Sequence, residues 1–218
     1  MATIEQMTVY AAQLDARTDE NAKNRPVTEA CVFKLQPEFA NDHAAAAAEF
    51  DSGIVTHCKP GAPYALGIRK IAWGFSSSDP STFVWLIDWE KIQDHWEFWK
   101  TAGFPPVMAT ISKLFQPGRP LVRHYDFGVQ GMFDSDITVA RIVIWDDGAE
   151  GKEKQRAREL GSAQGKAKHT RAGYAVDIDE TSWWCTLLGY DSEADARADV
   201  VYTGDGAESH IITDLLYA

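Results

Sequence analysis

The sequence predicts an α+β protein made of two tandem ferredoxin-like βαββαβ halves that close into one barrel. First, the spacing of apolar residues switches between strand and helix periods in the order β-α-β-β-α-β, and this order occurs twice along the 218 residues. Second, each half would form a four-stranded sheet with helices on one face only, so the two bare faces are expected to pack together. Burying about ten large side chains at roughly 2 kcal/mol each would make the halves inseparable.

The first half is expected over residues 27–130. Its strands are rich in β-branched and aromatic residues, as in TEACVFKL and TFVWLIDW, and prolines and glycines separate them from the helices. We expect strands at residues 28–35, 64–75, 82–89 and 121–127, and helices at residues 39–57, 90–101 and 107–115. Residues 1–26 are polar and weakly patterned, which predicts a flexible N-terminal arm with at most a helical turn or two at residues 8–14.

The second half is expected over residues 131–218. We expect strands at residues 137–145, 170–178, 182–190 and 209–216, and helices at residues 150–168 and 191–200. The amino-acid sequences of the two halves differ, so the evidence for a duplication is the order of elements rather than sequence identity.

The composition limits the classes of partner. The formal net charge of -11 argues against nucleic acid and anionic membrane surfaces, because both favour basic proteins. No apolar run approaches the roughly 18 residues of a membrane-spanning helix, and the N-terminus lacks the pattern of a secretory signal. Cys31, Cys58 and Cys185 are widely spaced and form neither a zinc pattern nor a disulfide framework. A reduced, cytoplasmic protein is expected.

Known catalytic fingerprints are missing from the sequence. There is no GxGxxG, P-loop or GxSxG motif, and no histidine pair has the i, i+4 spacing of a zinc-binding helix. We therefore expect neither a nucleotide cofactor nor a metal.

The strand at residues 121–127 offers a candidate for proton transfer. Side chains alternate across a strand, so His124 shares one face with Asp126, whereas Tyr125 lies on the other. A histidine beside a carboxylate is held in one tautomer and made more basic, although the same pair would also suit a solvent-facing edge strand. Tyr125 is the alternative hydrogen-bond donor. Arg141, which interrupts an apolar strand, could polarise a substrate carbonyl or pair with a carboxylate. The catalytic candidates are thus His124, Tyr125 and Arg141.

Large rings crowd the segment before that strand. Trp85, Trp89, Trp96 and Trp99 lie within fifteen residues, and a glycine and two prolines at residues 103–106 then break the helix. Such a stripe is either core or the wall of a pocket beneath a bent helix. The predicted substrate-binding residues are Trp85, Trp96, Phe98, Trp99, Phe104 and Met108. A structural role is expected for the neighbouring His95.

Residues 83–127, FVWLIDWEKIQDHWEFWKTAGFPPVMATISKLFQPGRPLVRHYDF, resemble the dimeric α/β-barrel superfamily, in particular the antibiotic-biosynthesis-monooxygenase-like and polyketide-cyclase-like domains and their tandem fungal versions. The residues that carry the resemblance are Trp89, His95, Phe98, Pro117, Gly118, His124 and Phe127. LLGYDSEADARADV resembles a degraded second copy. Members of the superfamily include cofactor-free oxygenases, haem-degrading enzymes, cyclases, dehydratases and isomerases. Most use neither a metal nor a nucleotide, and in several the pocket lies in one half, between sheet and helices.

The resemblance implies a cofactor-independent cyclase or isomerase, pericyclic (Diels–Alder type) or dehydrative, that acts on an apolar polyketide or terpenoid intermediate of secondary metabolism. An aromatic, water-poor pocket suits such a reaction, because it needs mainly a shape that folds the substrate and one or two hydrogen-bond donors. The alternatives are a cofactor-free monooxygenase or haem-handling protein, and a non-catalytic small-molecule-binding or stress protein. The expected partner is an apolar small molecule, and the expected assembly is a monomeric fused barrel or a homodimer.

Overall fold

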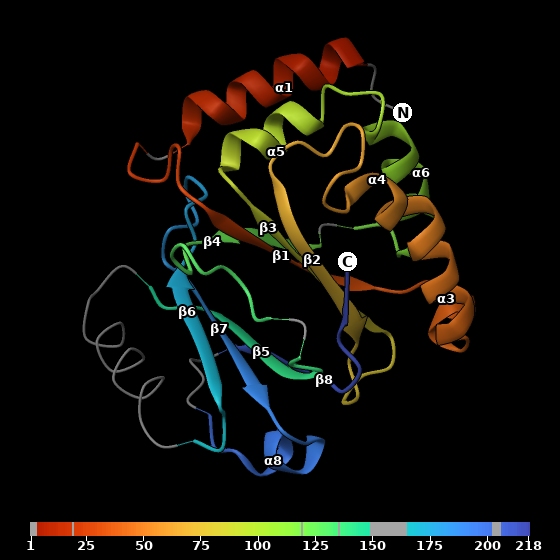
Figure 1. Ribbon diagram of the computed structural model, residues 1–218, viewed down its shortest axis with the longest axis vertical. Coiled ribbons are helices and arrows are strands. Elements are labelled where there is room, and N and C mark those ends of the chain that lie inside the picture. The colour runs from red at the N-terminus through yellow and green to blue at the C-terminus, as the bar shows by residue number, and fades with distance from the viewer. Residues whose placement is uncertain (1–3, 19, 119, 135, 149–164, 202–205) are drawn as a thin grey trace.

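The computed structural model describes residues 4–18, 20–118, 120–134, 136–148, 165–201 and 206–218. It contains two antiparallel sheets, and helices cover the outer face of the first one (Figure 1). The predicted α+β fold class is therefore confirmed. None of the described helices is both long and apolar enough to cross a membrane.

The first half runs from β1 to β4. Its strands are β1 (Val27–Lys34), β2 (Ile68–Phe75), β3 (Thr82–Trp89) and β4 (Leu121–Tyr125). Its helices are α2 (Pro37–Ala40), α3 (His43–Phe50), the π-helical η1 (Asp51–Val55), α4 (Thr56–Cys58), α5 (Ile92–Phe98) and α6 (Phe104–Leu114).

The second half supplies the remaining strands. Its elements are β5 (Val139–Asp146), β6 (His169–Tyr174), β7 (Trp183–Tyr190), α8 (Glu193–Ala198), β8 (Glu208–Ile212) and β9 (Leu216–Tyr217). The helix predicted at residues 150–168 falls mainly on residues outside the described part of the chain.

The two halves share one topology. The strand orders are β4-β1-β3-β2-β9 and β6-β7-β5-β8. Each half thus places its fourth, first, third and second strands side by side, and β9 crosses over to pair with β2 in the first sheet. Backbone bridges at Tyr125–Ala175 and Ser76–Ile212 join the two sheets along their borders. The repeated order of elements in the sequence is therefore a repeated fold, closed towards a barrel.

A shared core lies between the sheets. Because side chains alternate along a strand, Val84 and Leu86 of β3 point towards the second half. For the same reason, Ile142 of β5 and Leu187 of β7 point towards the first half. All four side chains are at most 1% exposed. Burial at this interface is the reason that the halves are expected to fold together.

The N-terminal segment is a helix rather than the flexible arm expected for residues 1–26. Helix α1 (Ile4–Arg17) lies beside α5 over the first sheet (Figure 1). Met7, Ala11 and Leu14 follow the i, i+4, i+7 spacing of one helical face, and Ala11 is only 1% exposed. The sequence signal for this helix was weak, because these three apolar residues lie in an otherwise polar stretch. The contact with α5 is what stabilises the helix.

The connection between the halves is held by a buried carboxylate. Both oxygens of Asp88 accept the backbone N–H of Met132 at 3.0 Å, and Thr28 Oγ1 donates to Asp88 Oδ1 at 2.6 Å. Gly131 approaches this carboxylate so closely that an added Cβ would lie 2.3 Å from Asp88 Oδ2.

Gly131→Ala should therefore destabilise the protein more than Gly128→Ala. Both glycines have positive φ angles, +63° and +74°, so alanine at either position should cost about 1–2 kcal/mol of backbone strain. A Cβ at position 128 meets nothing within 4 Å, whereas overpacking against Asp88 should add about 1–3 kcal/mol at position 131. Urea denaturation of the two variants measures the difference, and equal losses would contradict the contact.

Candidate active site

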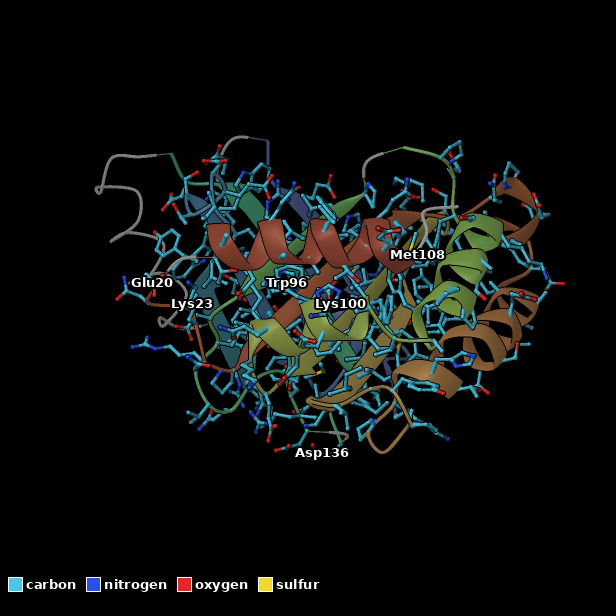
Figure 2. All side chains as sticks on the ribbon, turned by 90° about the horizontal axis from the view of Figure 1, so that it is seen from above. Glu20, Lys23, Trp96, Lys100, Met108 and Asp136 are labelled. Carbon is cyan, nitrogen blue, oxygen red and sulfur yellow. The ribbon has the colours of Figure 1, made fainter. Side chains whose placement is uncertain are left out.

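A pocket of about 650 Å³ lies between the first sheet and helices α1, α5 and α6. Its volume falls within the roughly 300–1,000 Å³ of small-molecule sites. In Figure 2, which looks down on α1, Trp96 lies where α1 and α5 run side by side, and Met108 lies on α6. The pocket wall includes all of the predicted substrate-binding residues: Trp85, Trp96, Phe98, Trp99, Phe104 and Met108. Their contact with a substrate remains a prediction.

Local periodicity explains why these rings face the pocket. Along β3, Trp85 and Trp89 alternate with residues that face the barrel core, so both indoles point towards the helices. His95 lies on α5, and Trp99 follows the last residue of that helix, one turn further on, so both side chains reach the pocket. Helix α6 then starts afresh at Phe104, after the break at Gly103.

His124 is the centre of the polar end of the pocket. Its Nδ1 lies 2.8 Å from Asp177 Oδ1, and its backbone N–H donates to Asp177 Oδ2 at 2.7 Å. Asp177 belongs to the turn between β6 and β7, so the second half supplies the carboxylate that orients a histidine of the first. His124 is only 2% exposed, and the two contacts fix its ring.

The contact between His124 and Asp177 shifts both pKa values. Burial by itself would lower the pKa of His124, but the charge of Asp177, the hydrogen bond to it and the charge of Glu29 outweigh burial, and the pKa of His124 is raised. Burial by itself would raise the pKa of Asp177, but the charge of His124 and the hydrogen bonds from it leave this pKa lowered. His124 is therefore a stronger base than a free imidazole.

A directed chain of hydrogen bonds leads from Trp99 to Asp177. Trp99 Nε1–H donates to His95 Nε2 at 2.7 Å, so a neutral His95 carries its proton on Nδ1. His95 Nδ1 lies 2.9 Å from His124 Nε2 and donates to it, which places the His124 proton on Nδ1, facing Asp177. Burial, followed by the charge of His124, lowers the pKa of His95 and keeps it neutral. While His124 is neutral, the chain thus leaves its Nε2 as a lone-pair acceptor.

Glu29 completes the polar cluster. Its Oε2 accepts Trp89 Nε1–H at 2.9 Å and lies 3.5 Å from His95 Nδ1 and 3.8 Å from His124 Nε2. The side chain is almost fully buried, and burial raises the pKa of Glu29 in spite of these neighbours. A buried carboxyl group of raised pKa can give or take a proton beside His124.

Glu29, His95 and His124 are also the described residues best placed to hold a metal ion, because one ligand atom of each lies within 4.8 Å of the others. The hydrogen bond from Trp99 argues against this use. A metal on His95 Nδ1 would move the ring proton to Nε2, where it would face the Trp99 N–H across 2.7 Å. In this geometry the cluster fits a proton relay better than a ligand set.

The other two catalytic candidates lie outside the pocket. Tyr125 points into the barrel core, where it is fully buried and stacks on Phe127 at 6.0 Å between ring centroids. Arg141 belongs to the second sheet, where its Nε donates to Ser209 Oγ at 2.9 Å and its Nη1 donates to the backbone oxygen of Asp199 at 3.1 Å. Of the three candidates, the structure brings only His124 to the pocket.

Two residues of the site were missed by sequence reasoning. The expected partner of His124 was Asp126, but Asp126 accepts the backbone N–H of Gly128 at 2.8 Å, and Asp177 takes its place. No sequence signal links His124 to a residue in the other half. Glu29 did leave a signal, because it is a lone carboxyl group on the strand face that also carries Cys31.

Asp177→Asn should lower the pKa of His124. The substitution removes the negative charge that outweighs the burial of the imidazole, so the charged form loses its stabilising partner. A general base works only when deprotonated, so any activity that depends on His124 should rise with pH at a lower pH in the variant than in the wild type. Titration of the imidazole by NMR measures the shift. Asp126→Asn is the control, and an equal shift in both variants would count against the pairing.

Comparisons with known proteins bear on the fold alone. No family model matches the sequence, and no curated protein is similar to it at the sequence level. Among solved structures, an anthrone oxidase-like protein has a TM-score of 0.63 at 9% identity, with 90% of this chain and 94% of that chain covered. A provisionally assigned monooxygenase of Fusobacterium nucleatum has a TM-score of 0.57 at 11% identity, with coverages of 88% and 94%. A second such protein, from Lactobacillus acidophilus, has a TM-score of 0.55 at 10% identity, with coverages of 86% and 93%. The chain therefore has the ferredoxin-like fold of these monooxygenase-type structures over most of its length.

Proposed function

We propose that the protein is a cofactor-independent enzyme that moves a proton on an apolar, ring-containing small molecule and so promotes its cyclisation or isomerisation. The observation that carries the proposal is the His124–Asp177 pair at the polar end of an aromatic pocket of about 650 Å³. Polyketide and terpenoid intermediates have the required apolar body with a few carbonyl or hydroxyl groups.

The first step is the removal of a proton from the substrate. A C–H next to a carbonyl, or a phenol, would displace the His95 N–H from His124 Nε2 and pass its proton to that nitrogen. Asp177 would stabilise the imidazolium that forms, because it already accepts from His124 Nδ1 at 2.8 Å. General base catalysis of this kind typically contributes about 10²- to 10⁴-fold.

The second step is the stabilisation of the enolate or phenolate. Once displaced from His124, His95 Nδ1–H is free to donate to the substrate oxygen on which charge develops. The walls of Trp96 and Trp99 would hold the carbon skeleton folded while a new bond forms or a double bond moves. His124 then gives its proton back to the enolate or phenolate product, directly or through Glu29, and returns to its neutral form.

The same base would serve a second function, that of a cofactor-free monooxygenase. An electron-rich anthrone or quinol, once deprotonated, can react with O₂ directly, and the pocket has room for three fused rings. The anthrone oxidase-like protein named above shares the fold, which fits this candidate without favouring it over the first.

Anthrone tests both candidates. Without oxygen and in D₂O, the protein should speed the exchange of the acidic C–H of anthrone for deuterium, as followed by NMR. In air, conversion of anthrone and O₂ to anthraquinone and water above the spontaneous rate would identify the monooxygenase. A pocket that binds anthrone and accelerates neither reaction would leave a binding protein and overturn the proposal.

A further inference from the structure

Trp85 has a buried hydrogen-bond donor that nothing in the described chain satisfies. Its side chain is 4% exposed and lines the pocket, and its Nε1 has no hydrogen-bond partner among the described residues. A buried N–H without a partner is unfavourable, so such groups in a pocket wall are natural contacts for a ligand acceptor.

The sheet register places this donor away from the proton-transfer residues. On β1, Glu29 lies opposite His124 and Cys31 lies opposite Trp85, with β1 between the other two strands. Trp85 is thus two residues further along the sheet and two strands across from His124. From strand dimensions, the two backbones are roughly 12 Å apart. A flat molecule of two or three rings spans such a distance.

The described pocket wall offers no unpaired cation to an anionic group, because His124 already faces Asp177. Among the described lining residues there are four acidic side chains, Glu29, Asp177, Asp179 and Glu180, and no lysine or arginine. The nearby Arg123 lies on the opposite face of β4, pairs with Glu180 at 3.0 Å and covers the Trp183 ring at 3.7 Å. A carboxylate or phosphate would therefore lose its hydration in this pocket without gaining a positively charged partner that is free of a carboxylate of its own.

We infer that the ligand is an uncharged ring compound with a carbonyl or ether oxygen that accepts a hydrogen bond from Trp85 Nε1–H. This inference deepens the proposed function and rests on it for the proton-transfer end of the substrate. Trp85 is thus a specificity residue at the far end of the ligand, and anionic analogues are excluded.

A matched set of ligands tests the inference by binding alone. Fluorenone has the ketone oxygen, fluorene has the same rings without it, and 9-oxofluorene-2-carboxylate adds a negative charge. Calorimetry should give about 2- to 10-fold tighter binding of fluorenone than of fluorene, because one neutral hydrogen bond contributes about that much. The carboxylate should bind at least about tenfold more weakly than fluorenone, since an unpaired buried charge is costly.

Two tryptophan variants locate the hydrogen bond. Trp85→Phe should bring the fluorene-to-fluorenone ratio of Kd values close to one. Trp73→Phe is the control, because Trp73 lies directly opposite Trp85, is 5% exposed and also has an unpartnered Nε1, yet does not line the pocket. The Trp85 indole N–H signal should also shift more on addition of fluorenone than of fluorene, which a purely structural tryptophan would not show.

Three results would overturn the inference: failure of fluorenone to bind, an unchanged ratio in Trp85→Phe, or equal binding of the carboxylate. Fluorenone has no proton for His124 to remove, so these outcomes are independent of catalysis. Loss of the anthrone reactions with an intact fluorenone preference would instead refute the proposed function and leave the ligand class standing.

Discussion

Replacement of His124 by glutamine should lower the rate of anthrone deuterium exchange by about 10²- to 10⁴-fold, the usual contribution of a general base. Glutamine keeps a polar group that can reach Asp177, but it cannot take up a proton at neutral pH. Circular dichroism and the thermal midpoint establish whether the variant is folded, which matters because His124 is only 2% exposed.

His169→Gln is the matched control for this experiment. His169 starts β6, is exposed and does not line the pocket, so the exchange rate should remain within about twofold of the wild-type rate. A His124 variant that is folded and fully active would show that another group removes the proton. A loss of 10²-fold in Tyr125→Phe or Arg141→Ala would also refute the assignment to His124.

Leu86→Ala should lower the free energy of unfolding by about 2–5 kcal/mol, as large-to-small substitutions in cores do. Leu86 is 1% exposed and belongs to the core between the two sheets, so the cavity left behind weakens the contact of both halves. We expect a single unfolding transition at a lower urea concentration, because each sheet needs the other to bury its apolar inner face.

Leu66→Ala is the control for the core substitution. Leu66 is 78% exposed, and its truncation should change the free energy of unfolding by less than about 0.5 kcal/mol. Tryptophan fluorescence reports mainly on the ring-rich first half, and far-UV circular dichroism reports on both. Two separate transitions, with only one of them shifted by Leu86→Ala, would show that the halves unfold independently.

Most of the fold was predictable because it depends on local periodicity. The alternation in residues 82–89 and the helical spacing from Ile92 to Trp99 are strong signals, and repetition of the element order predicted the second sheet. The full extent of helix α1 was not predicted beyond a turn or two at residues 8–14. Its core-facing residues are only Met7, Ala11 and Leu14, and its stability comes from contact with α5.

The site was less predictable than the fold. Periodicity places His124 and the tryptophans on one face of their elements, and the structure shows them around one pocket. Periodicity carries no information on contacts between residues of distant elements. Asp177 is 53 residues from His124 along the chain, so their contact could not be predicted in this way. The roles of His95 and Trp99 depend on which nitrogen carries each proton, which follows only from the geometry of the whole hydrogen-bond chain.

The origin of Asp177 in the second half constrains how such a protein can change over time. A chain without its second half would keep His124 but lose the part of the pocket wall that residues 176–180 supply, including the carboxylate that raises the proton affinity of the histidine. A recombinant that received a foreign second repeat would retain a strong base only if the new β6–β7 turn brought an acid to the same place. Selection on the chemistry of His124 therefore also acts on the β6–β7 turn of the other half. The two halves can diverge in sequence elsewhere, but this turn and His124 must change together.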